Sequence, residues 1–115
     1  MGEFSKKYAS LKSKTAISSL FIDGEKLKSG SILMLYKISE KGTEVAFSVK
    51  KKDYKLAVDR NRIKRLMREA FRLNQNELEN SFELFFINLG KEKKPFEYYN
   101  EKIKTLLTRL NENLK

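Results

Sequence analysis

The 115-residue chain contains no cysteine, no histidine and no tryptophan, and it has a single proline. Without cysteine it can form neither disulfides nor thiolate metal sites, which is compatible with a reducing cytoplasm. Without histidine it lacks the commonest general base and the commonest metal ligand. No run of 18 apolar residues occurs, and the N-terminus has no signal-peptide core. We therefore expect a cytoplasmic protein with no membrane partner.

Acidic residues are dispersed, which argues against catalysis by the protein itself. The three aspartates, Asp23, Asp53 and Asp59, stand at an expected helix end, in a loop and at a helix start. The glutamates are scattered, and no pair has the spacing of a two-metal nuclease site. No glycine-rich nucleotide motif is present. We expect no catalytic residue, no protein-bound metal or cofactor, and no small-molecule substrate.

The positive charge is concentrated in one stretch of the chain. The formal net charge is +10, and residues 50–72 contribute +7 of it, from ten cations and three acidic residues. Residues 29–49 and residues 73–115 each sum to zero. Such an asymmetry is typical of a surface that binds nucleic acid.

Residues 57–72 have the period of an amphipathic helix. Asp59 is placed to cap its N-terminus, and Arg65 and Glu69 have the spacing of a surface ion pair. A solvated charged face is the common alternative for such a helix, but the arginine fork suits phosphate and favours RNA. The apolar arc is Ile63, Leu66, Met67, Ala70 and Phe71, and the opposite arc is Asn61, Lys64, Arg65, Arg68 and Arg72, with Arg60 and Arg62 at the edges.

The rest of the chain predicts an α+β domain, a sheet with helices packed mainly on one face. Residues 1–10 are expected to form a basic, mobile arm, and residues 11–115 a single RNA-binding domain. Residues 25–30 could include a short edge strand. The expected elements are a helix at 11–23, strands at 31–39 and 44–50 that form a hairpin, the basic helix ending near 73 or 74, a strand at 82–89 and a helix at 96–114.

The basic helix resembles the signature of the bacterial ribonuclease P protein subunit. The matching residues are Arg60-Asn61-Arg62, Lys64-Arg65 and Arg68-Glu69, with Ala57-Val58 before them and Phe71-Arg72 after them. Two more segments resemble the family: Phe47-Ser48-Val49 resembles the strand that leads into the motif, and Leu20-Phe21 with Gly24 resembles the end of its first helix. The resemblance implies an αβββαβα two-layer sandwich with a four-stranded mixed sheet (ribosomal protein S5 domain 2-like). It also implies a left-handed βαβ crossover through the basic helix, where general rules predict a right-handed one.

The resemblance also implies a function. Proteins of that family are accessory subunits of an endoribonuclease whose catalysis is carried by an RNA with Mg²⁺. The implied partners are the ribonuclease P RNA and precursor tRNA, whose 5′ leader is removed, and the protein is expected to be monomeric within the holoenzyme. The residues implied to bind the RNA subunit are Lys51, Lys52, Arg60, Asn61, Arg62, Lys64, Arg65 and Arg68.

A second RNA surface is expected where the first helix meets the sheet. The resemblance implies that Ile17, Phe21 and either Leu35 or Tyr36 contact the 5′ leader, with Tyr36 preferred. Aromatic side chains on such a sheet can stack splayed bases. Periodicity alone slightly favours core positions for Phe21, Tyr36 and Phe47.

The strand at 44–50 alternates between two kinds of side chain. Val45, Phe47 and Val49 share one face, so parity assigns Phe47 to the core. Ala46 and Ser48 lie on the other face, where small side chains leave room for a strand of nucleic acid.

Two other functions fit the basic helix. The chain could be a structural RNA-binding protein of the small ribosomal type, without a substrate role. It could also be a DNA-binding regulator that places the helix in a major groove, although no dimer signature supports that. Cleavage of precursor tRNA by an RNA partner separates the first alternative from a ribonuclease P subunit.

Overall fold

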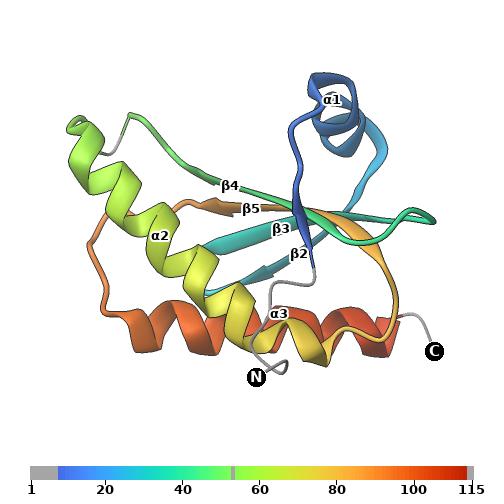
Figure 1. Cartoon of the computed structure of the whole chain (residues 1–115). Coiled ribbons are helices and arrows are strands. Elements are labelled where there is room, and N and C mark those ends of the chain that lie inside the picture. The colour runs from blue at the N-terminus through green and yellow to red at the C-terminus, as the bar shows by residue number, and fades with distance from the viewer. Residues whose placement is uncertain (1–7, 53, 114–115) are drawn as a thin grey trace.

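In the computed structural model, which describes residues 8–52 and 54–113, one mixed sheet separates helix α1 from helices α2 and α3 (Figure 1). The sheet has the order β1-β4-β5-β3-β2. The strands are β1 (Ala9–Ser10), β2 (Glu25–Ser29), β3 (Ile32–Ile38), β4 (Glu44–Val49) and β5 (Phe82–Asn88), and the helices are α1 (Lys14–Asp23), α2 (Ala57–Asn74) and α3 (Phe96–Asn113), with a 3₁₀ turn at Gln75–Glu77.

Strand β5 lies at the centre of the sheet. It pairs in parallel with β4 and antiparallel with β3. The predicted hairpin of the strands at 31–39 and 44–50 was therefore wrong, because β5 lies between them. Leu84, Phe85 and Phe86 on β5 are at most 9% exposed, so this strand buries both of its faces. A strand that is apolar on both faces is most stable where neighbours and helices cover it on every side.

The hairpin is formed instead by β2 and β3, which pair antiparallel. Its two-residue turn contains Gly30, whose φ of 57° is in the left-handed region. This backbone conformation favours glycine, and a Cβ here would also lie 2.7 Å from the hydroxyl oxygen of Tyr98, which would have to shift. The polar connection at 25–30 thus contains the edge strand that the sequence allowed.

Strand β1 lies inside the segment predicted as an arm. The N–H of Ala9 donates to the carbonyl of Thr43 at 3.0 Å, and the N–H of Leu11 donates to that of Val45 at 2.9 Å. The predicted arm of residues 1–10 is therefore too long at its C-terminal end, because the open edge of β4 offers backbone partners to the chain. Residues 1–7 lie outside the described residues. The four longer strands are those expected, and β1 adds a fifth.

Apolar side chains form a separate layer on each face of the sheet. The larger layer packs the sheet against α2 and α3 and includes Met67, Phe71 and Ile103, all fully buried. The smaller layer lies under α1 and consists of Leu11, Leu20, Leu35 and Phe85. Helix α2 is the crossover between the parallel neighbours β4 and β5. Both sides of the sheet are thus occupied, but α1 covers its side with a single short helix (Figure 1).

Candidate nucleic-acid interface

Helix α2 buries four of the five residues of the predicted apolar arc, partly buries the fifth, Leu66, and turns the basic arc outward. Ile63, Met67, Ala70 and Phe71 are at most 2% exposed, as the periodicity predicted. Their burial against the sheet and α3 fixes how the helix is rotated. On the other side, Asn61, Arg62, Arg65 and Arg68 are exposed, and Lys64 is half-buried.

The start of α2 differs from the prediction. The N–H groups of Asp59 and Arg60 donate to the carbonyl of Leu56, so the helix already runs from Ala57. The prediction that Asp59 caps the helix was therefore wrong. Its carboxylate lies in the first turn, 3.0 Å from Nζ of Lys93, where a negative charge complements the helix dipole.

Arg60 is engaged with the protein's own backbone. Its Nη1 donates to the carbonyl oxygens of Tyr54, at 2.6 Å, and of Lys55, at 3.0 Å. Through these bonds it fastens the loop after β4 to the first turns of α2. Lys51 and Lys52 are exposed in that same loop, so Arg60 helps to place them beside the helix. Direct contact of Arg60 with RNA stays a prediction.

Three cations on the basic arc or at its edge are free to bind a polyanion. Within residues 8–52 and 54–113, the side chains of Arg62, Lys64 and Arg65 make no hydrogen bond or ion pair. The predicted pair of Arg65 with Glu69 does not form, because Glu69 binds a different arginine. The guanidinium of Arg68 lies 5.7 Å from the ring centroid of Phe47, which holds it against the edge of the larger core.

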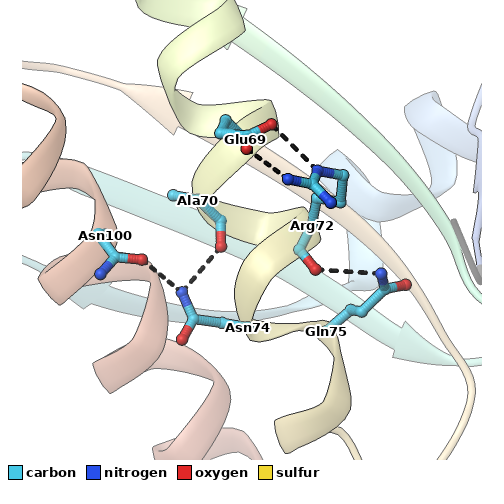
Figure 2. Close-up of polar contacts among 6 residues, drawn as sticks. All are labelled: Glu69, Ala70, Arg72, Asn74, Gln75 and Asn100. Carbon is cyan, nitrogen blue, oxygen red and sulfur yellow. Dashed lines mark hydrogen bonds and ion pairs between the residues drawn. The ribbon is translucent and has the colours of Figure 1, made fainter. Parts of the chain in front are cut away.

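The C-terminal end of α2 is tied down (Figure 2). Glu69 accepts hydrogen bonds from Nε of Arg72 at 3.1 Å and from its Nη2 at 2.5 Å. This pairing lowers the pKa of Glu69 and raises the pKa of Arg72. Nδ2 of Asn74 donates to the carbonyl of Ala70 at 2.8 Å and to Oδ1 of Asn100 on α3 at 2.7 Å. The open part of the basic arc is therefore its N-terminal part.

The second predicted surface lies on the α1 face of the sheet. Phe21 is 51% exposed, and its ring meets that of Phe85 edge-on with centroids 5.4 Å apart. Ile17 packs half-buried against the same layer, and Leu35 is buried within it. The structure thus brings Ile17, Phe21 and Leu35 together. The core position that periodicity slightly favoured for Phe21 was wrong.

Tyr36 faces the opposite side of the sheet. It is 7% exposed in the larger core, edge-on to Phe82 at a centroid distance of 6.3 Å. Successive residues of a strand point to opposite faces, so Leu35 and Tyr36 cannot both face α1. The prediction that Tyr36 shares a surface with Ile17 and Phe21 was wrong, and the alternative residue Leu35 takes that place.

Phe47 follows the parity of its strand. Its ring stacks on that of Phe86, with centroids 5.6 Å apart and planes at 11°, and it packs against the larger core. Ala46 packs against the smaller layer on the α1 face. The small side chains predicted to leave space for nucleic acid therefore lie on the same face as Phe21.

Helix α1 is fastened to β3 by a polar contact. Nζ of Lys37 lies 2.5 Å from Oδ1 of Asp23 and also donates to the hydroxyl of Ser19. The hydrogen bond from Lys37 lowers the pKa of the Asp23 carboxyl. This contact sets the position of the helical turn that carries Phe21.

Sequence reasoning missed two cations that lie next to α2. Lys93 and Lys94 precede α3, and together with Asn61, Arg62 and Arg65 they line one concave surface. The zero net charge of residues 73–115 concealed them, because it averages over acidic residues elsewhere in that segment.

The described part of the chain shows neither a cluster of metal ligands nor a membrane-spanning helix. Among residues 8–52 and 54–113, no three histidine, cysteine, aspartate or glutamate side chains are grouped where they could hold a metal ion. In the same residues, no helix is both long enough and apolar enough to cross a bilayer.

Comparison with known proteins shows the family to which the chain belongs. The model of the family described as Ribonuclease P matches residues 4–111. The chain belongs to the ribonuclease P protein family. It is 49% identical over 70 residues to the ribonuclease P protein component of Chlorobaculum tepidum, which covers 55% of this chain and 46% of that protein. It is 31% identical over 87 residues to the ribonuclease P protein component of a Thermoanaerobacter species. This match covers 75% of this chain and 74% of that protein. The chain spans about half the length of the first curated relatives that it matches.

Solved structures of the family share the fold. The ribonuclease P protein of Thermotoga maritima has a TM-score of 0.77 at 26% identity, with 87% of this chain and 96% of that chain covered. The protein of Staphylococcus aureus has a TM-score of 0.76 at 16% identity, with 92% and 96% covered, which bears on the fold alone. The single α+β domain, with its five-stranded mixed sheet and three helices, is that of bacterial ribonuclease P proteins.

Proposed function

We propose that this protein is the accessory protein subunit of a ribonuclease P ribonucleoprotein. The observation that carries the proposal is the open basic arc of α2, where Arg62, Lys64 and Arg65 have no neutralising partner in the described chain. Such cations bind RNA phosphates and release counterions, which gives affinity that falls with salt. Asn61, exposed in the same arc, offers a donor and an acceptor to a base edge or a ribose hydroxyl.

In this proposal the RNA partner carries the chemistry. The magnesium ions are bound by the ribonuclease P RNA, and the protein contributes no reacting group. By neutralising phosphates at the α2 surface, the protein lowers the concentration of divalent cation that the RNA needs for its active fold. This division of roles agrees with the dispersed carboxylates of the chain.

The α1 face is proposed to hold the 5′ leader of precursor tRNA. Phe21 is half exposed and its ring meets that of Phe85 edge-on, so the exposed part of the ring can receive a base. A base stacked on an aromatic side chain is worth about 1–3 kcal/mol. The small side chains of Ala46 and Ser48 leave space over the neighbouring strand for a nucleic-acid chain. Because mature tRNA lacks the leader, this surface would favour substrate over product.

The test is cleavage of a 5′-extended precursor tRNA by a bacterial ribonuclease P RNA at low magnesium, with and without this protein. We expect strong stimulation that disappears when the leader is shortened to a single nucleotide. Tight RNA binding without stimulation would instead favour the structural RNA-binding protein of ribosomal type. In that case α2 would serve as an anchor in folded RNA, and the α1 face would have no substrate.

A further inference from the structure

A groove of about 610 Å³ lies between the N-terminal half of α2 and the segment that precedes α3. In Figure 1 that segment descends from β5 to α3 at the left of the view, on the side where α2 begins. The two walls therefore come from parts of the chain that are about thirty residues apart in sequence. The residues lining the groove are Val58, Asp59, Asn61, Arg62, Arg65, Lys93, Lys94 and Pro95.

The lining is strongly basic on both walls. Arg62 and Arg65 project from α2 without partners in the described chain, and Lys93 and Lys94 stand opposite. Asp59 is the one carboxylate among the lining residues. When cations line both walls of a concave surface, their fields add inside it, and an anion there is attracted more strongly than at a flat surface.

We infer that this groove seats a sugar-phosphate segment of the RNA partner, with Lys93 and Lys94 as RNA-binding residues on its second wall. The inference rests on the proposed function. The planar forks of Arg62 and Arg65 suit paired contacts with phosphate oxygens, while a lysine provides a flexible point charge. RNA held from both sides is fixed in direction as well as in position, which a single basic helix face does not achieve.

The ion pair with Asp59 limits how readily Lys93 can bind a phosphate. Its Oδ1 lies 3.0 Å from Nζ of Lys93, and the lysine side chain is 62% exposed while that of Asp59 is 21% exposed. A phosphate that binds Lys93 must compete with this carboxylate and approach its like charge. Lys94 has other partners, with its Nζ 3.2 Å from Oε1 of Glu92 and 5.5 Å from the ring centroid of Tyr98. Asp59 therefore weakens binding in the groove and would limit it to RNA that also engages Arg62 and Arg65.

The experiment measures binding of a bacterial ribonuclease P RNA as a function of salt. The test variant is Lys93→Ala with Lys94→Ala. The matched control is Lys91→Ala with Lys104→Ala, which removes the same charge from exposed lysines that do not line the groove. Each lost phosphate contact reduces the slope of log K against log salt by about 0.7–0.9. In the test variant we expect the slope to decrease by the amount of up to two lost contacts, one for each lysine. In the control we expect a much smaller decrease of the slope.

A third variant tests the role of Asp59. We expect Asp59→Asn to bind the RNA severalfold more tightly, and to lose this gain when Lys93 and Lys94 are also replaced. Equal slopes for test variant and control would overturn the inference, even if the wild-type protein binds RNA and stimulates cleavage. A wild-type protein that neither binds nor stimulates the RNA would overturn the proposed function, and the inference with it. Circular dichroism of every variant checks that the fold is retained.

Discussion

The guanidinium of Arg60 donates a hydrogen bond of 2.6 Å to the backbone carbonyl of Tyr54. Tyr54 is 5% exposed and belongs to the larger core. A residue that the sequence marked as an RNA ligand is thus also the link between the basic loop and the helix beside it. It follows that the arginines of α2 differ in role, although they share one motif.

Replacing Arg60 with alanine is expected to lower the free energy of unfolding by about 1–3 kcal/mol, because the part-buried carbonyl of Tyr54 and the exposed carbonyl of Lys55 lose a charged donor. Urea unfolding measures this change. The matched control is Arg62→Ala, which removes an exposed arginine that has no hydrogen bond or ion pair in the described chain and should shift stability by no more than about 0.5 kcal/mol. Equal stability of the two variants would contradict the positioning role of Arg60.

Replacing Arg65 and Arg68 with alanine is expected to weaken binding of the ribonuclease P RNA and to flatten its salt dependence by about one unit per lost phosphate contact. Arg72→Ala is the comparison on the same helix, and it should change the slope less, because Arg72 is already paired with Glu69. Binding assays over a range of salt concentrations measure the slopes. An unchanged slope for the double variant would mean that neither side chain touches phosphate.

Replacing Phe21 with alanine is expected to reduce affinity for precursor tRNA more than for mature tRNA, by about 1–3 kcal/mol for one stacked base. The holoenzyme's affinity for the two RNAs measures the difference. Leu20→Ala is the neighbouring control: Leu20 is fully buried, so its truncation should cost about 2–5 kcal/mol of folding stability. If Phe21→Ala destabilises the fold as much as Leu20→Ala, then Phe21 is a packing residue.

The carboxyl of Asp23 should titrate below its ordinary pKa of 3.8, because Lys37 donates a hydrogen bond to its charged form. Because the pKa of Asp23 is lower in the folded state, the pair with Lys37 stabilises the fold at pH values above the ordinary pKa of the carboxyl. That contribution is lost as the pH falls through the lower, folded value. NMR titration of the Asp23 side-chain carbon measures this pKa in the wild type and in Lys37→Met, where it should rise towards 3.8. An identical titration in both proteins would show that the contact does not persist in solution.

The sequence by itself determined those features that depend on neighbours along the chain. The apolar period of residues 57–72 predicted which side of α2 is buried, and Ile63, Met67 and Phe71 lie there. The alternation along β4 placed Phe47 in the core, and the concentration of cations predicted one basic face. Helical and strand periods are properties of the local backbone, so they can be read without knowing the rest of the fold.

Only the tertiary structure decided which distant segments meet. β5 lies between β3 and β4 because a strand apolar on both faces is buried best at the centre, and no local pattern states its neighbours. The same packing turned Leu35 towards α1 and Tyr36 away from it, since only one of two successive strand residues can face that helix. It also brought Lys93 to Asp59, across a separation in sequence that charge counting along the chain cannot span.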